Sequence, residues 1–135
     1  WLAVTGDLPA APILLGLAVA AWIAGFDIIY ALLDIDFDRA HGVHSVPARF
    51  GPAGALWFTR ILHLIAVGFL VAAGVAADAG WLYMVGVGVC GAVLLAENAI
   101  VRPGNTARVQ FAFAQANSLL AIVFFVFVAL DIAIS

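Results

Sequence analysis

Four long apolar stretches restrict the possible folds of this chain more than any other feature. They run near residues 10–33, 53–77, 81–101 and 111–134, and each approaches the roughly 20 apolar residues that a helix needs to cross a bilayer. Backbone amides and carbonyls must be paired inside lipid, and a helix pairs them within one segment. The sequence therefore predicts an all-α fold, a polytopic transmembrane helix bundle with four spans.

The composition agrees with a membrane environment. Of the 135 residues, 67% are hydrophobic and 10% are charged, whereas soluble domains carry about 25% charged residues. The net charge is −3 and lysine is absent, so no basic patch is present to neutralise nucleic-acid phosphates. We expect an integral membrane protein that contacts membrane lipid and binds no nucleic acid.

The arginines predict the orientation of the bundle. They all lie in or beside the first and third links between spans: Arg39, Arg49, Arg60, Arg102 and Arg108. With four spans these two links face the same side, and the positive-inside rule makes that side cytoplasmic. We expect a protein of a prokaryotic inner or cell membrane with this face in the cytoplasm.

An acidic segment ends the first span and is the main candidate for chemistry. At about 100° per residue, Asp27, Tyr30, Asp34 and Asp38 share a stripe of about 80° on a continuous helix, and Asp36 points away. A carboxylate at membrane depth is costly, so it is usually paired, neutralised or used. The spacing predicts a site for a hard cation.

Magnesium suits the outer part of this stripe. Asp34 and Asp38 are neighbours at i and i+4 and repel each other unless a cation lies between them. Mg²⁺ is usually held by one or two carboxylates together with substrate phosphates, so a diphosphate is the expected ligand. Asp27 lies deeper, nearer a second substrate. Tyr30 either donates a hydrogen bond or presents its ring to a cation in the site, or it anchors the helix at the membrane interface. The alternative for the aspartates is that they begin a solvated loop.

Cationic side chains follow the acidic segment directly. Arg39, His41, His44 and Arg49 lie in the first link, and arginine or histidine can contact diphosphate oxygens. The alternative for each is ordinary positive-inside charge.

Further polar groups lie inside the other spans. We expect His63 to pair with a neighbouring helix and Glu97 to pair with an arginine such as Arg60 or Arg102. Asn117 is either a hydrogen-bonding residue between helices or a contact of an acceptor substrate.

The acidic segment resembles the second aspartate-rich motif of the UbiA superfamily of intramembrane aromatic prenyltransferases, D-x-x-Y-x-x-x-D-x-x-x-D. Asp27, Tyr30, Asp34 and Asp38 occupy its four places. The following residues 37–51 resemble members that prenylate 4-hydroxybenzoate or a dihydroxynaphthoate. Residues 97–103 and Asn117 are similar to the C-terminal part of the family.

The resemblance implies a function. It is the Mg²⁺-dependent transfer of a polyprenyl group from polyprenyl diphosphate to an aromatic acid acceptor, in ubiquinone or menaquinone biosynthesis. Carried over to this sequence, it implies catalytic roles for Asp27 and Tyr30, metal binding by Asp34 and Asp38, diphosphate binding by Arg49 and His44, and acceptor binding by Asn117.

One part of the family pattern is absent. The first aspartate-rich motif, N-D-x-x-D-x-x-x-D, has no match in residues 1–135. Members have about nine spans, so this chain resembles the last four, the C-terminal part of one membrane-embedded prenyltransferase domain. We expect its partner to be an N-terminal half with the first motif, and we expect the chain alone to be inactive.

The sequence offers two other functions for the acidic stripe. A cation-transport or other non-enzymatic membrane subunit could use the acidic stripe as an ion path, and it predicts carboxylates near the midplane of several spans. A phosphatidyl-transfer enzyme also uses aspartates and metal, but its pattern begins Asp-Gly and continues through Ala-Arg, which does not fit around Asp27.

Overall fold

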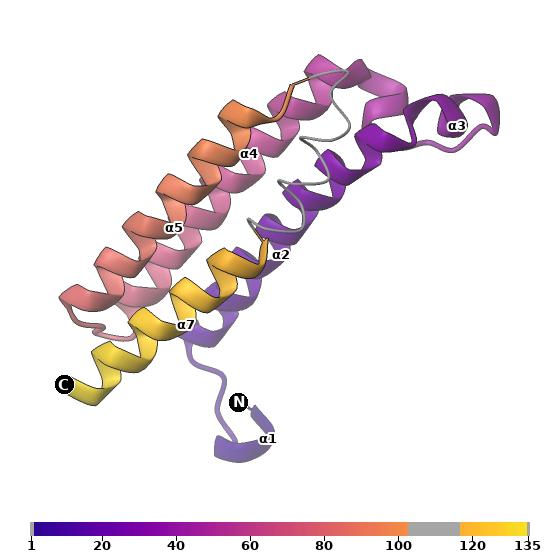
Figure 1. The fold of residues 1–135 in the computed structure, drawn as a ribbon. Helices are drawn as coiled ribbons and strands as arrows, with labels where there is room; N and C mark the ends of the chain where they lie inside the picture. Colours follow the sequence, from indigo (N-terminus) through magenta and orange to yellow (C-terminus); the bar gives the residue numbers. More distant parts are fainter. Residues whose placement is uncertain (1, 103–116, 135) are drawn as a thin grey trace.

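The computed structural model describes residues 2–102 and 117–134 and is helical throughout its regular elements. Four long helices lie alongside one another, and a short helix projects beyond one end (Figure 1). In chain order the elements are α1 (Leu2–Thr5), α2 (Ala10–Tyr30), the 3₁₀ turn η1 (Ala31–Leu33), α3 (Ile35–Ala40), α4 (Val46–Ala76), α5 (Trp81–Ile100) and α7 (Asn117–Ile134).

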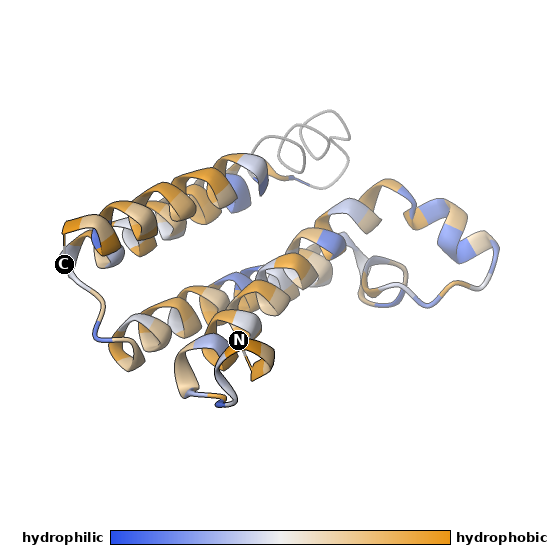
Figure 2. Cartoon of the chain, turned by 90° about the horizontal axis from the view of Figure 1, so that it is seen from below, coloured by the Kyte–Doolittle hydropathy of each residue, from blue (hydrophilic) through white to orange (hydrophobic). Residues whose placement is uncertain are grey.

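Four stretches of the described chain are long and apolar enough to cross a membrane. They are Ala10–Leu33, Val46–Ala76, Trp81–Ile100 and Asn117–Ile134. Hydrophobic residues cover the long helices, whereas hydrophilic ones gather on α3 (Figure 2). The predicted all-helical, four-span fold class is confirmed; residues 111–116 of the fourth predicted span lie outside the described residues.

Helix α4 begins earlier than its predicted start at residue 53. The Ser45 hydroxyl accepts a hydrogen bond from the Ala48 amide at 3.3 Å, and Pro47 lies in the first turn, where its missing amide costs no hydrogen bond. Gly51 then interrupts the helix with φ 72° and ψ 170°, a conformation open essentially to glycine alone. Part of the predicted loop is therefore a helical turn joined to the span by a kink.

Helix α2 packs along α4 and α5 packs along α7, and the core lies where the two pairs meet. Its buried side chains fall into clusters that include Ile29 with Leu56, Leu70 with Tyr83, and Phe26 with Cys90 and Leu120. Hydrogen bonds also join the helices. The Tyr83 hydroxyl donates to the Leu70 carbonyl at 2.8 Å, and the Thr59 hydroxyl donates to the Gly25 carbonyl at 3.3 Å.

One carboxylate closes the end of the bundle opposite α3. Asp131 of α7 is 5% exposed. Its two oxygens accept hydrogen bonds from the Gly80 amide at 2.8 Å and the Tyr83 amide at 3.2 Å. Gly80 directly precedes α5 and Tyr83 lies in its first turn, where amides lack partners within the helix and carry partial positive charge. Asp131 thus caps α5 from another helix.

Candidate functional site

The acidic segment does not form one continuous helix. Helix α2 ends at Tyr30, the 3₁₀ turn follows, and Asp34 has φ −108° and ψ 10° before α3 begins. A 3₁₀ turn has about 3.0 residues per turn rather than 3.6, so the helical phase is lost between Tyr30 and Asp34. The expectation that all four motif residues share one helical stripe was wrong for this reason.

The outer pair keeps its predicted spacing. The Asp38 amide donates to the Asp34 carbonyl at 2.8 Å, which preserves one helical turn between the two residues. Asp34 and Asp36 are exposed, whereas Asp38 is 8% exposed. The Val43 amide donates to the Asp38 carbonyl at 2.8 Å and folds the following loop against α3.

Asp27 and Tyr30 lie on a different part of α2 from its packed face. Gly25, Phe26 and Ile29 are buried, whereas Asp27 and Tyr30 are exposed. A carboxylate within a membrane span faces protein or a water-filled cavity rather than lipid. This side of α2 therefore requires a polar or protein environment.

The donor set fits part of a magnesium site. In residues 2–102 and 117–134, no group of three histidine, cysteine, aspartate or glutamate side chains is placed to hold a metal ion. Asp34 and Asp38 offer hard carboxylate oxygens one turn apart, and Mg²⁺ accepts such a pair with water and phosphate completing its shell. Metal binding by these two residues stays a prediction.

Cations of the first link follow the acidic segment in the chain and lie at the same end of the bundle. Arg39 Nε donates to the Ala48 carbonyl at 3.4 Å and joins α3 to α4. The Arg49 guanidinium lies 5.4 Å from the centre of the Phe50 ring, and His44 is exposed. Diphosphate binding by Arg49 and His44 stays a prediction. Arg108 lies outside the described residues.

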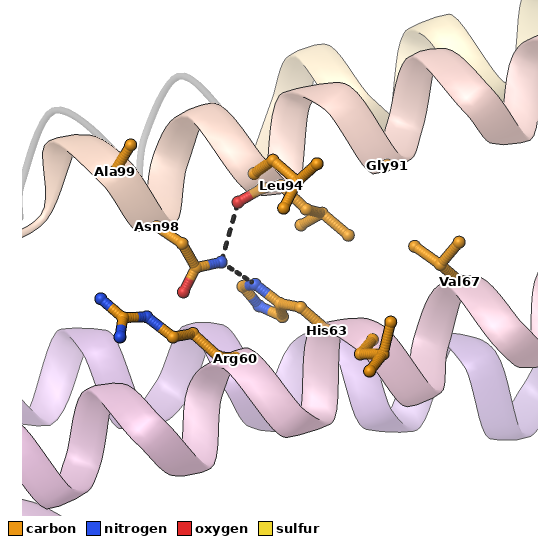
Figure 3. A pocket seen from close by; sticks show the side chains of 9 residues that line it. Arg60, His63, Val67, Gly91, Leu94, Asn98 and Ala99 are labelled. Carbon is orange, nitrogen blue, oxygen red and sulfur yellow. Dashed lines mark hydrogen bonds between the residues drawn. The ribbon is translucent and has the colours of Figure 1, made fainter.

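A buried polar cluster joins α4 to α5. Asn98 Nδ2 donates to the Leu94 carbonyl at 2.8 Å and lies 2.9 Å from His63 Nδ1 (Figure 3). His63 therefore pairs with a neighbouring helix, as predicted. Glu97 is 2% exposed, and its titratable neighbour among the described residues is His63, with Nδ1 and Oε2 3.9 Å apart. The prediction that Glu97 pairs with Arg60 or Arg102 was wrong.

Three residues that make contacts between helices were not predicted from the sequence. Asn98 was not singled out as the partner of His63, nor Gly25 as the residue that makes room for it, although a Cβ at Gly25 would collide with the imidazole. Asp131 was not recognised as a cap, although a lone carboxylate within an apolar span was a signal that it has a partner. Asn117 begins α7 and is half-buried, and its role stays a prediction.

Known relatives of this chain are prenyltransferases. The chain is 38% identical over 84 residues to the mitochondrial 4-hydroxybenzoate polyprenyltransferase of Arabidopsis thaliana, covering 62% of this chain and 20% of that protein. It is 39% identical over 82 residues to the 4-hydroxybenzoate octaprenyltransferase of Pseudomonas savastanoi pv. phaseolicola, covering 61% and 27%. An Aromatoleum aromaticum 4-hydroxybenzoate octaprenyltransferase is 28% identical over 122 residues, covering 90% and 41%.

A solved structure shares the fold. The apo structure of a UbiA homolog from Aeropyrum pernix K1 superposes with a TM-score of 0.78 at 35% identity, covering 90% of this chain and 42% of that one. The chain thus spans between a fifth and about two fifths of the length of these relatives. The model of the UbiA prenyltransferase family matches residues 1–125, and this chain therefore belongs to the UbiA prenyltransferase family.

Proposed function

We propose that the protein carrying this chain transfers a polyprenyl group from a polyprenyl diphosphate to an aromatic acid, 4-hydroxybenzoate or a dihydroxynaphthoate, in quinone biosynthesis. The observation that carries the proposal is the acidic segment. It places exposed carboxylates at the end of a membrane span in a chain of this family. The names of the relatives support 4-hydroxybenzoate as the acceptor.

Each motif residue has a chemical role in this proposal. When bound, Mg²⁺ neutralises charge on the departing diphosphate. Asp34 and Asp38, one helical turn apart, would hold that ion, and Arg49 and His44 would contact the diphosphate oxygens. The prenyl carbon–oxygen bond breaks, the acceptor ring forms a carbon–carbon bond with the allylic cation, and the ring then loses a proton.

The inner residues act on the organic substrates. Asp27 lies one turn before the end of α2, where its carboxylate orients the acceptor or takes the ring proton. Tyr30 presents its phenol ring beside the allylic cation, whose charge a ring face attracts. Asn117 contacts the acceptor from α7.

The remaining parts of the site come from outside this chain. Because the described residues gather no third metal-binding side chain, we propose that a segment with the first aspartate-rich motif completes the site and that the present chain alone is inactive. The arginine-rich end carries the site, so the reaction takes place at the cytoplasmic face.

Transfer of a labelled prenyl group to 4-hydroxybenzoate by the complete protein in detergent tests the proposal. Asp34→Asn and Asp38→Asn should each lower turnover by at least about 100-fold, because each removes transition-state electrostatic stabilisation worth about 3 kcal/mol.

Asp36→Asn is the matched control, since Asp36 is an exposed carboxylate of the same segment and should leave turnover within about twofold. Wild-type turnover in both metal-site variants would refute the assignment. A loss in all three variants would point to general charge at this end rather than to a metal site.

A further inference from the structure

A groove between α4 and α5 is lined by residues other than those of the acidic segment. It encloses about 480 Å³, within the range of small-molecule sites, about 300–1,000 Å³. Its lining residues within 2–102 and 117–134 belong to α4 and α5, whereas Asp27 lies on α2 and Asp34 and Asp38 lie beyond it. Among these described residues the groove shares none with the proposed catalytic site.

The groove is polar at one end and apolar along its length. Arg60, His63 and Asn98 converge at the polar end, with Val67 and Gly91 further along (Figure 3). The apolar walls include Leu64 and Leu95, which are each 74% exposed. A ligand for this groove has a charged head and a hydrocarbon body.

The polar end lies at the depth of lipid headgroups. Asn98 is in the last turn of α5, which ends at Ile100. The Arg60 guanidinium lies 5.5 Å from the Trp57 ring centre, and tryptophan and snorkelling arginine are both typical of the membrane interface. Val67 lies about 10 Å deeper along α4 than Arg60, at 1.5 Å per residue, which is the depth of acyl chains.

The polar end also holds an unsatisfied acceptor. Asn98 donates through Nδ2, but its Oδ1 is buried and accepts no hydrogen bond in the described part of the chain. Figure 3 shows this oxygen on the side of Arg60. Leaving a buried acceptor unpaired is unfavourable, so a ligand hydroxyl that donates to it is favoured.

We propose that this groove binds one anionic glycerophospholipid whose headgroup carries a hydroxyl. The phosphate pairs with the exposed Arg60 guanidinium, a headgroup hydroxyl donates to Asn98 Oδ1, and one acyl chain lies along Leu64, Val67 and Leu95. Charge complementarity selects this occupant, because a basic residue between membrane helices at the cytoplasmic face attracts anionic headgroups. The inference does not rest on prenyl transfer.

Native mass spectrometry of the complete protein, titrated in detergent with phosphatidylglycerol and separately with phosphatidylcholine, tests the site. Phosphatidylglycerol should bind more tightly, and Arg60→Gln should weaken its binding about fivefold through the lost charge. Gly91→Leu should abolish binding by filling the groove, in which a Cβ at Gly91 would lie 3.8 Å from Val67.

The controls match these two variants. Arg102→Gln removes an exposed arginine near the same end of α5, and Gly88→Leu adds the same bulk to the same helix where a Cβ meets nothing within 4 Å; both should retain binding. Equal retention of the two lipids, or unchanged phosphatidylglycerol binding in both groove variants, overturns the proposal. Displacement of phosphatidylglycerol by a prenyl diphosphate that the same variants weaken also overturns it, because the groove is then a substrate site.

Discussion

The two ends of the bundle use aspartate in opposite ways. At one end Asp131 is 5% exposed, and both of its oxygens accept amides of α5. At the other end Asp27 and Asp34 are exposed, and no described residue donates a hydrogen bond to their side chains. A carboxylate whose lone pairs are already occupied by backbone stabilises the fold, whereas one without such donors remains available to a cation or substrate.

The difference shows that a rare charge in an apolar chain has two separate explanations. Both kinds of aspartate satisfy the rule that a charge at membrane depth is paired or used. Asp131 follows the first alternative, and we propose that Asp34 and Asp38 follow the second. Variants at the two ends should therefore separate stability from activity.

Removal of magnesium should produce the largest effect. Chelation by EDTA should lower prenyl transfer by the complete protein about 10³-fold, since metal neutralisation of a leaving group contributes several kcal/mol. The melting temperature should change little, because the Asp34 side chain does not cap α3 by a hydrogen bond and so adds no described contact to the fold. Added Mg²⁺ should restore turnover. Full activity in EDTA would contradict the proposal that the aspartates at this end bind a metal ion while Asp131 stabilises the fold.

Asp131→Ala should have the opposite profile. It removes two hydrogen bonds to a charged acceptor and leaves two α5 amides unpaired, which should cost about 3 kcal/mol of unfolding free energy. Asp131→Asn keeps one acceptor oxygen and should lose less. Denaturant titration measures the stability, and turnover well below the melting temperature should stay within about twofold. An unchanged unfolding curve would show that the cap adds no stability.

Gly51→Ala should destabilise the kink of α4 beside the catalytic end. Its φ of 72° with ψ of 170° should cost about 1–3 kcal/mol in any other residue. Gly68→Ala is the matched control in the same helix, where a Cβ meets nothing within 4 Å and alanine favours the helix. Thermal unfolding of both variants measures the contrast, and equal melting temperatures would argue against a strained kink.

Thr59→Val should have the smallest effect. It removes a neutral hydrogen bond to the Gly25 carbonyl with little change of shape, and such bonds between membrane helices contribute about 0.6 kcal/mol on average. Comparison of its unfolding free energy with that of Asp131→Ala gives the ratio between a neutral and a charged interhelical contact. If Thr59→Val lowers the unfolding free energy as much as Asp131→Ala does, the Asp131 cap contributes no more stability than a neutral hydrogen bond between helices.

The fold could be predicted because its cause is local. Each apolar stretch is long enough to cross a bilayer by itself, so the four-span helical class followed without any knowledge of contacts. The candidate site followed only in part. The i,i+4 relation of Asp34 and Asp38 held, but the shared stripe with Asp27 failed because the 3₁₀ turn at Ala31–Leu33 has no distinctive residue pattern to predict it.

Contacts between helices were the least predictable. The sequence marked His63 as needing a partner, but its contact with Asn98 depends on the rotation of α5 about its own axis. The cap on α5 depends in the same way on where α7 places Asp131. The periodicity of one span carries little information on the rotation of the next. His63 and Asp131 could therefore be recognised as polar residues in apolar spans, but their partners could not be identified.

The cap on α5 has a consequence for the order of events during biosynthesis. The carboxylate that the Gly80 and Tyr83 amides require lies 51 and 48 residues further along the chain. Chains emerge from the ribosome N-terminus first. When α5 enters the membrane, the amides at its start are therefore still hydrated or bound to another hydrogen-bond acceptor. Helix α7 is translated after α5 and supplies the missing acceptor, so the cap on α5 forms only after α7 has been inserted.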